Sequence, residues 1–283
     1  MPHTFHRNER AAQLPARLSR SWLLTSAANE DFFEPNYESE ADSIILDLED
    51  GTPADQKDSA RERVVRALNS GMRAWVRVNA ITTDQWSEDL AALSEAEGLR
   101  GIVLAETEQP DHITRTAMMS RAGTPVIGLI ESAVGLVNAV DIAKAPGTFR
   151  LAFGTGDFRK DTGISDDPMA MAHARSTLVI ASRVGNLPGP IDGPANGVDE
   201  AGLREACRIT ATMGMTGKLT LDPGQTDAIN RGLAPSEEEI SWAREMLKKE
   251  KDGAVPKEGS YLPRLARARK VSTLAQTYGL WRD

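Results

Sequence analysis

Two acidic residues, Glu131 and Asp157, stand where apolar segments end, in the stretches VIGLIE and LAFGTGD. Two carboxylates brought together without basic partners repel each other, and a cation between them removes that repulsion. The four histidines fall in the N-terminal segment or in helical stretches, so we expect ligation by oxygen atoms alone. Such a site, completed by water, describes Mg²⁺, with Mn²⁺ as an alternative. The competing interpretation is that both acids only cap helices.

Arg77 lies inside another apolar stretch, WVRVN, on the same side as Trp75 and Asn79. A buried guanidinium group needs an anionic partner. Asp47 or Glu49 could be that partner, which would make Arg77 structural. A bound substrate carboxylate could equally be the partner, as a site in which a metal polarises a keto acid requires. The spacing leaves both interpretations open.

Polar side chains follow seven of the eight β-rich stretches described below. They are Asp47, Glu49, Asp50, Arg77, Asn79, Glu106, Glu131, Asp157, Asp192 and Asp222. In a parallel barrel the carboxyl ends of the strands meet at one rim, where the chemistry lies. Each residue alone is explained as well by a helix cap or a solvated loop, but the whole set predicts an acidic rim.

The elements that must position these residues repeat along the chain. We expect β-rich stretches at 20–27, 43–48, 73–79, 101–106, 124–131, 150–157, 188–193 and 217–222, the seventh being the weakest. Helices are expected at 55–70, 84–97 and 199–214, opened by Asp55, Asp84 and Asp199, and at 167–185. This alternation predicts a (β/α)₈ TIM barrel. A doubly wound open sheet is the alternative, but no glycine-rich turn follows the first stretch.

Three regions follow from this order. Residues 1–19 are expected to form a polar, basic arm, residues 20–235 the barrel, and residues 236–283 a helical C-terminal extension. Such an extension either caps the barrel or packs on a neighbouring subunit.

Composition limits the partners. The 283 residues carry a formal net charge of −8, which argues against nucleic acid and anionic membranes. Neither a secretory signal nor an apolar run of membrane-spanning length is present, and the single cysteine, Cys207, is expected in the core. A cytoplasmic location is therefore expected.

Several motifs follow one another in a familiar order. They include DSIILDLEDG at 42–51, VRVN at 76–79, IESAVGL at 130–136 and FGTGDF at 153–158. From residue 20 to about 250 the sequence resembles the citrate lyase β-subunit-like branch of the HpcH/HpaI aldolases. The resemblance implies a trimeric or hexameric barrel that joins or splits a keto acid and an acyl-CoA enolate.

The resemblance also implies roles for individual residues. Glu131 and Asp157 would hold Mg²⁺, with Glu131 also at the substrate, and Arg77 would bind the keto acid. Basic groups implied to lie near the coenzyme A phosphates are Arg20, Lys57 and Arg61.

Three departures from the family pattern concern the thioester half of the site. Glu106 and Asp222 replace a lysine and a histidine, and the stretch 259–263 lacks the expected aspartate. The catalytic base is therefore expected to be metal-bound water, Glu49 or Asp50. The leading hypothesis is a Mg²⁺-dependent lyase acting on a 3-hydroxy acid or a citryl-, malyl- or citramalyl-CoA thioester. The alternatives are an aldolase on free keto acids and a non-catalytic metabolite-binding or assembly subunit.

Overall fold

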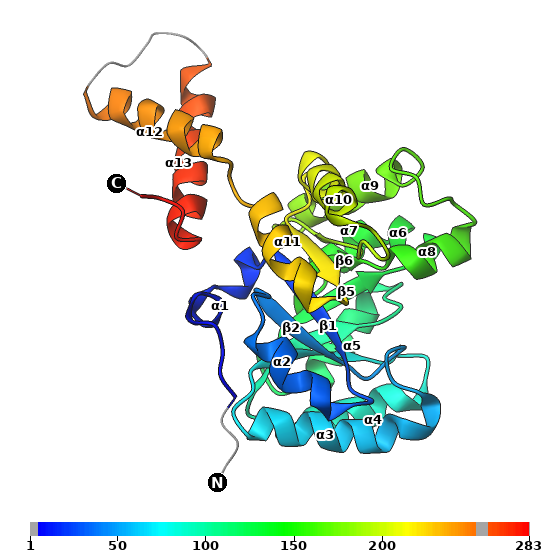
Figure 1. The fold of residues 1–283 in the computed structure, drawn as a ribbon. Helices are drawn as coiled ribbons and strands as arrows, with labels where there is room; N and C mark the ends of the chain where they lie inside the picture. Colours follow the sequence, from blue (N-terminus) through cyan, green and yellow to red (C-terminus); the bar gives the residue numbers. More distant parts are fainter. Residues whose placement is uncertain (1–4, 253–259, 283) are drawn as a thin grey trace. The chain divides into compact units, whose positions relative to one another are not determined.

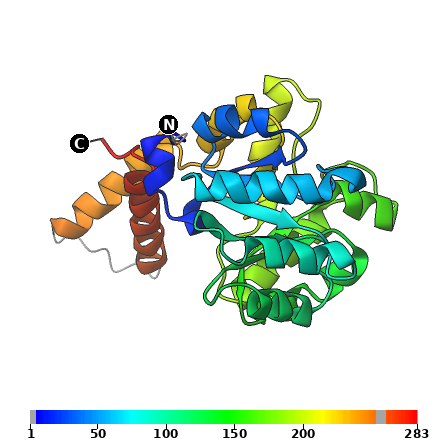
Figure 2. The same ribbon diagram turned by 90° about the horizontal axis from the view of Figure 1, so that it is seen from below.

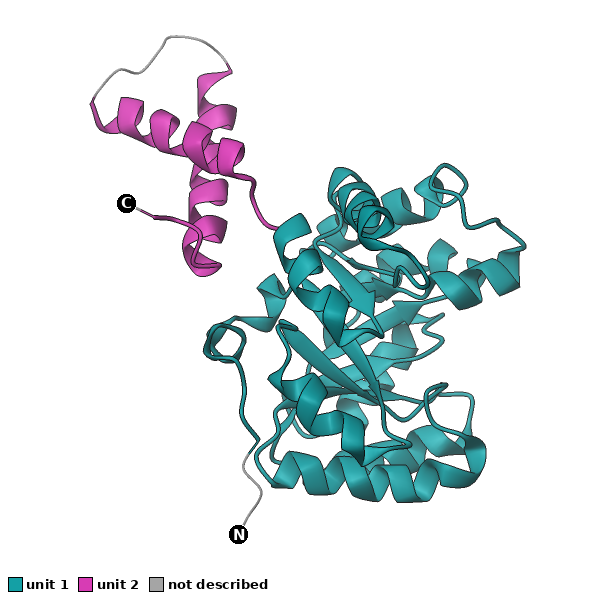
Figure 3. Cartoon of the chain, in the orientation of Figure 1, with its two compact units in different colours: residues 1–232 teal, residues 233–283 magenta. Residues whose placement is uncertain are grey.

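The structure is a computed structural model that describes residues 5–252 and 260–282. The chain divides into two compact units, Met1–Gly232 and Leu233–Asp283, which Figure 3 shows in different colours. The sequence analysis set the corresponding boundary between residues 235 and 236.

Eight parallel strands form the centre of the first unit and close into a barrel in the order β1 to β8. Their bounds are β1 Ser21–Ser26, β2 Ser43–Asp47, β3 Ala74–Val78, β4 Leu99–Leu104, β5 Val126–Ile130, β6 Thr148–Phe153, β7 Ile191–Asp192 and β8 Gly217–Thr220. All eight predicted strands exist, and the predicted (β/α)₈ barrel is confirmed.

Helices follow the strands and lie on the outside of the barrel in both views (Figures 1 and 2). They are α2 Phe33–Glu38, α3 Lys57–Asn69, α4 Asp84–Leu93, α5 Pro110–Met119, α6 Ala133–Val137, α7 Ala139–Lys144, α8 Thr155–Thr162, α9 Ala172–Val184, α10 Glu200–Thr212 and α11 Thr226–Gly232. Within the described part of the chain, no helix is both long and apolar enough to cross a membrane.

Helix starts differ in part from the sequence prediction. Asp199 caps α10 as expected, because its side chain accepts a hydrogen bond from the backbone N–H of Gly202. Asp55 instead lies inside a short 3₁₀ helix, η3 (Ala54–Gln56), that precedes α3. Asp84 is the first residue of α4 and follows the cap position, so its charge faces the helix dipole without capping a backbone N–H.

Alternate strand residues point into the barrel, where an apolar cluster lies. Trp22, Trp75 and Ile127 belong to this inner cluster, and the two indole rings meet edge to face at 5.4 Å. A larger cluster fills the layer between strands and helices. Cys207 of α10 is buried as predicted and faces Gly232 of α11. Arg77 lies two residues beyond Trp75 and therefore faces the inside of the barrel.

Strand β7 has only two residues, which matches the weak, proline-rich stretch in the sequence. Ile191 pairs with Ala152 of β6 and with Gly217 of β8, and Asp192 pairs with Lys218. Side chains add to this short ladder. The Lys218 ammonium donates to the carbonyl of Gly193 at 2.7 Å.

The N-terminal segment contains short helices where the sequence indicated an arm. They are α1 (Glu9–Gln13) and the 3₁₀ helix η1 (Ala16–Leu18). The Arg10 side chain forms an ion pair with Asp42, and the Arg7 side chain donates to the backbone carbonyls of Tyr37 in α2 and of Ser39, which follows α2. The basic residues therefore bind this segment to the barrel, which composition alone did not indicate.

The second unit is a pair of helices, α12 (Glu237–Lys251) and α13 (Tyr261–Thr277). Their apolar faces share one cluster that includes Ile240, Met246, Leu265 and Val271. Ser236 and Glu239 form a capping box at the start of α12. The helical C-terminal extension is thus confirmed, while the predicted break between the helices falls at residues 253–259, outside the described residues.

Candidate active site

Glu131 directly follows β5 and is buried at the barrel rim, with 7% of its surface exposed. Its Oε1 accepts a hydrogen bond of 2.6 Å from the backbone N–H of Glu106, which follows β4. On the β6 side lies Gly154, where a Cβ atom would stand 2.4 Å from Oε2 of Glu131. Only glycine leaves room for the carboxylate there, so two neighbouring loops fix its position.

The pKa of Glu131 is raised to about 8, mainly by burial. The N–H of Glu106 and the charge of Arg77 act in the opposite direction, whereas the charges of Glu49 and Asp157 raise the pKa further. Glu131 therefore shares its surroundings with all three charged groups, and the negative charge there is not fully compensated.

Arg77 of β3 meets two carboxylates from the end of β2. Its Nε and Nη2 donate to the two oxygens of Asp47 at 2.7 and 2.6 Å, a bidentate pair. Its Nη1 lies 2.7 Å from Oε2 of Glu49. Both partners that the sequence offered are thus used at once.

Glu49 is held less completely than Asp47. Its Oε2 is buried and receives no hydrogen bond from any residue that the structure describes, although the charge of Arg77 is close. Burial raises the pKa of Glu49 to about 7, against the lowering effect of Arg77. Asp47, by contrast, also accepts from the backbone N–H groups of Glu49 and Gly51 at 3.0 and 2.9 Å.

Asp157 lies in the first turn of α8, and not at the end of β6 as the sequence suggested. The strand ends four residues earlier, at Phe153, because the following residues already begin the helix. The Asp157 side chain is 41% exposed and pairs with Lys160 at 2.7 Å. Asp157 raises the pKa of Lys160, and the charges of Asp50 and Glu49 act in the same direction.

The donor set at this rim fits a hard divalent cation. Among the described residues, no three His, Cys, Asp or Glu side chains are grouped closely enough to form a complete metal site. Glu131 and Asp157 supply two carboxylates, and open space adjoins Gly156 between them in sequence. One or two carboxylates with several waters is the usual coordination of Mg²⁺ in proteins.

The three basic residues predicted near coenzyme A phosphates are not gathered in one place. Lys57 donates to the carbonyls of Leu48 and Glu49 at 2.6 and 2.8 Å, so it braces the loop after β2. Arg61 is buried and pairs with Asp89 at 2.8 Å. Both groups are engaged within the protein.

Arg20 lies at the opposite end of the barrel. It immediately precedes β1, and its side chain pairs with Asp42 at 2.8 Å and donates to the carbonyl of Asn230 at 3.0 Å. Its place before a strand, at the amino end, separates it from the rim that follows the strands. This position corrects the prediction that Arg20 lies with the substrate-binding groups.

One supporting residue was missed by sequence reasoning. Asp89 of α4 is fully buried and accepts hydrogen bonds from the backbone N–H and the side-chain amide of Asn79, at 3.0 and 2.7 Å. It thereby fixes the end of β3 beside Lys57, which donates to Asn79 at 2.8 Å. The available signal was its spacing, since Trp86 and Leu93 mark the buried face of the same helix.

A buried acid with basic partners occupies the other side of the rim. Asp192 of β7 is 1% exposed, pairs with Arg175 at 3.0 Å and lies 3.5 Å from Lys218. Thr210 also donates to it at 2.7 Å. Although burial opposes the effect, Lys218 and Arg175 lower the pKa of Asp192. We call these residues the Asp192 cluster.

The two remaining rim acids are exposed and local. Asp222 caps a 3₁₀ helix, η4 (Pro223–Gln225), by accepting from the backbone N–H of Gly224 at 2.8 Å. The Glu106 side chain is exposed, and its backbone is left-handed, with φ at 46°. Its backbone N–H, and not its side chain, contributes to the position of Glu131.

Comparison with known proteins places these features among related chains. Residues 20–223 match the HpcH/HpaI aldolase/citrate lyase family, and residues 238–279 match the HpcH/HpaI aldolase C-terminal domain. An L-malyl-CoA/beta-methylmalyl-CoA lyase of Cereibacter sphaeroides is 29% identical over 82% of this chain and 84% of that protein. A (3S)-malyl-CoA thioesterase of the same organism is 31% identical over 81% of each chain.

Solved structures give the same picture. CitE from Mycobacterium tuberculosis, in complex with magnesium, acetoacetate and coenzyme A, has a TM-score of 0.76 and 27% identity, covering 92% of this chain and 99% of that one. RipC from Yersinia pestis has a TM-score of 0.70 and 31% identity, covering 80% of this chain and 100% of that one.

Proposed function

Because the chain belongs to the HpcH/HpaI aldolase/citrate lyase family, we propose that it is a Mg²⁺-dependent carbon–carbon lyase acting on a 3-hydroxyacyl thioester of coenzyme A. One observation carries the proposal. The buried Glu131 carboxylate is fixed by the Glu106 N–H and by the space at Gly154, on the same rim as Arg77. Related proteins that act on malyl-CoA thioesters and a relative that binds magnesium and coenzyme A support it.

Glu131 and Asp157 would hold the metal, with water completing its coordination. Bound there, Mg²⁺ supplies a Lewis acid that polarises the oxygen of the keto acid. The short hydrogen bond from Glu106 keeps Oε1 of Glu131 in place. The glycine at position 154 leaves room for its Oε2.

Arg77 would bind the carboxylate of the keto-acid portion. Asp47 holds Nε and Nη2, so the guanidinium plane is already oriented. Nη1 faces Glu49 at 2.7 Å, and Oε2 of Glu49 accepts no hydrogen bond from a described residue. A substrate carboxylate can therefore replace Glu49 at Nη1, which releases Glu49 to face the reacting groups.

Glu49 is the better of the two predicted bases. In cleavage, the 3-hydroxyl group loses its proton, the carbon–carbon bond breaks, and the hydroxyl carbon becomes a keto carbon. The electron pair passes to the carbon beside the thioester, which then gains a proton. Burial gives Glu49 a pKa of about 7, where it can accept and return a proton, whereas Asp50 is exposed.

The test is turnover of malyl-, citramalyl- and citryl-CoA by the purified full chain, with Mg²⁺ or with EDTA. A lyase releases keto acid and acyl-CoA in equal amounts only with Mg²⁺, and Glu131→Gln abolishes this. Glu205→Gln, which changes an exposed side chain of α10, is the matched control and should retain full activity. Release of free coenzyme A thiol without keto acid would indicate a thioesterase instead, and no turnover of any thioester would contradict the proposal.

A further inference from the structure

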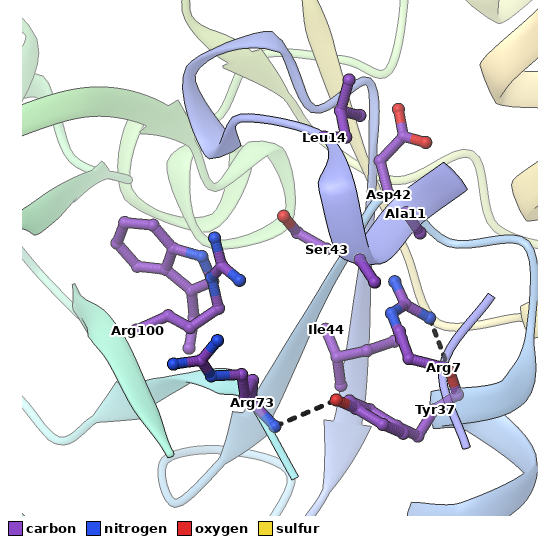
Figure 4. Close-up of a pocket in the computed structure, with 11 residues that line it drawn as sticks. Arg7, Ala11, Leu14, Tyr37, Asp42, Ser43, Ile44, Arg73 and Arg100 are labelled. Carbon is purple, nitrogen blue, oxygen red and sulfur yellow. Dashed lines mark hydrogen bonds between the residues drawn. The ribbon is translucent and has the colours of Figure 1, made fainter. Parts of the chain in front are cut away.

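A small cavity of about 90 Å³ lies at the amino ends of β2, β3 and β4. The N-terminal segment and α2 complete its wall, and three arginines, Arg7, Arg73 and Arg100, line it (Figure 4). Arg73 immediately precedes β3, and Arg100 is the second residue of β4. Because strands run from this end toward the rim, the cavity, which we call the arginine cavity, is separate from the candidate active site.

The positive charge of the arginine cavity is not neutralised by its own lining. The single acid there, Asp42, already pairs with Arg20 and Arg10. Among the described residues, Arg7 donates only to neutral groups, the carbonyls of Tyr37 and Ser39 at 2.6 and 3.3 Å and that of Ala41.

Arg73 and Arg100 lie on the same side of the cavity, across from Tyr37 and Arg7 (Figure 4). Neither guanidinium group forms a hydrogen bond or an ion pair with any residue that the structure describes, whereas the backbone N–H of Arg73 donates to the Tyr37 hydroxyl at 3.1 Å. Two like charges are thus held together in a chain whose net charge is −8.

Two further observations agree. Burial lowers the pKa of Arg100, and the charge of Arg73 lowers it further. Trp75 also lines the cavity, and its buried indole N–H has no acceptor among the described residues. Indole and guanidinium nitrogens donate and cannot accept, so these lining groups offer hydrogen-bond donors to a ligand that accepts, and their positive charge favours an anion.

We propose that the arginine cavity binds a small phosphate group, either inorganic phosphate or the phosphate of a metabolite. Guanidinium groups match phosphate oxygens in pairs. Arg7 approaches from one side while Arg73 and Arg100 approach from the other, an arrangement that suits a tetrahedral oxyanion better than a planar carboxylate. A cavity of about 90 Å³ has room for several water-sized groups and therefore for one such ion.

Calorimetric titration of the full chain with inorganic phosphate, in chloride buffer at constant ionic strength, tests this. We expect saturable binding that is weakened at least about tenfold in Arg73→Gln/Arg100→Gln. The matched control is Arg204→Gln/Arg208→Gln, which removes the same charge from exposed α10 and should leave binding unchanged. Glycerol phosphate and a nucleoside triphosphate, titrated in parallel, distinguish free phosphate from a phosphate ester.

Thermal unfolding separates binding from a structural role. Without phosphate, Arg73→Gln/Arg100→Gln should be at least as stable as the natural chain, because it removes a repulsion and no hydrogen bond. With phosphate, only the natural chain and the control should gain stability. Absence of saturable phosphate binding, equal binding by Arg73→Gln/Arg100→Gln, or equally tight binding of acetate would overturn the proposal.

Discussion

Glu131 and Asp192 are both buried carboxylates at the carboxyl ends of strands in one barrel, yet their surroundings are opposite. Asp192 has two cationic neighbours and a hydroxyl donor, and its pKa is lowered. Glu131 has one backbone N–H donor and further acids nearby, and its pKa is raised to about 8. The charge of Asp192 is thus balanced by its protein neighbours, whereas that of Glu131 is left for a ligand to balance.

This difference separates a carboxylate that stabilises the fold from one that is available for function. A buried carboxylate with full partners favours the folded state, whereas one without them opposes it until a ligand supplies the missing charge. Two buried carboxylates on one rim are therefore expected to have opposite effects on the stability of the fold. Substitutions at the two places should show this directly.

The largest expected effect is that of Glu131→Gln. Loss of a metal carboxylate removes several kcal/mol of charge stabilisation, so we expect turnover to fall about 10³-fold. Above pH 8 the variant should nevertheless be more stable than the metal-free natural chain. We expect its free energy of unfolding in urea to be higher by on the order of 3 kcal/mol.

The sign follows from the raised pKa of Glu131. Its favourable contribution to folding is complete below about pH 4.5 and is lost as pH rises through about 8, because the unfolded chain ionises first. The stability difference between variant and natural chain should therefore grow over that range. If the difference in urea midpoint between the variant and the natural chain were the same at pH 5 and at pH 8.5, the charge of Glu131 would not be uncompensated in the folded state.

Asp192→Asn should have the opposite effect on stability. It leaves the charges of Lys218 and Arg175 buried without their carboxylate, which costs about 3 kcal/mol in urea unfolding near pH 7. Because the pKa of Asp192 is lowered in the folded state, its contribution is present above about pH 4 and is lost as pH falls below that. A variant as stable as the natural chain at pH 7 would show that the cluster is not a stabilising one.

Arg77→Lys tests the link between the two interpretations of Arg77. The charge remains, but the bidentate geometry toward Asp47 is lost, so kcat/KM should fall about 30-fold to 100-fold. In the condensation direction we expect the KM for the keto acid to rise more than kcat falls. If the role of Arg77 is purely structural, Arg77→Lys should instead lower stability and leave the KM for the keto acid unchanged.

Gly154→Ala is expected to have the smallest effect. Its methyl group would stand 2.4 Å from Oε2 of Glu131 and must displace the carboxylate, weakening Mg²⁺ binding about tenfold. Gly156→Ala is the matched control, since no atom lies within 4 Å of its added methyl group. Calorimetric Mg²⁺ titrations of both variants should differ, and equal affinities would argue against Glu131 as a ligand.

The sequence predicted the barrel and Glu131 well for the same reason. Apolar strands alternate with helices at regular intervals, and Glu131 comes directly after one of them, so its rim position follows from the strand itself. Asp157 was harder to place, because the glycine-containing stretch before it reads as continuing strand while α8 already begins at Thr155.

Pairing between distant residues could not be predicted. The sequence offered Asp47 and Glu49 as alternative partners of Arg77, and only the fold shows that both are used. The spacing of α4 indicated the buried face on which Asp89 lies, but not that its side chain bonds Asn79. The arginine cavity depends on Arg7, Arg73 and Arg100 meeting from separate segments, which no local pattern records.

The two-residue strand β7 gives the barrel a seam. Elsewhere at least three backbone pairs join each strand to the next, but Ile191 alone pairs with β6 and only two pairs join β7 to β8. Side chains add to these contacts, since Arg150 of β6 donates to the carbonyl of Gly189 and Lys218 of β8 donates to that of Gly193. Backbone amides beside this seam should exchange with solvent deuterium sooner than those of β2 or β5. We therefore expect the barrel to open locally beside Asp192 more readily than beside Glu131.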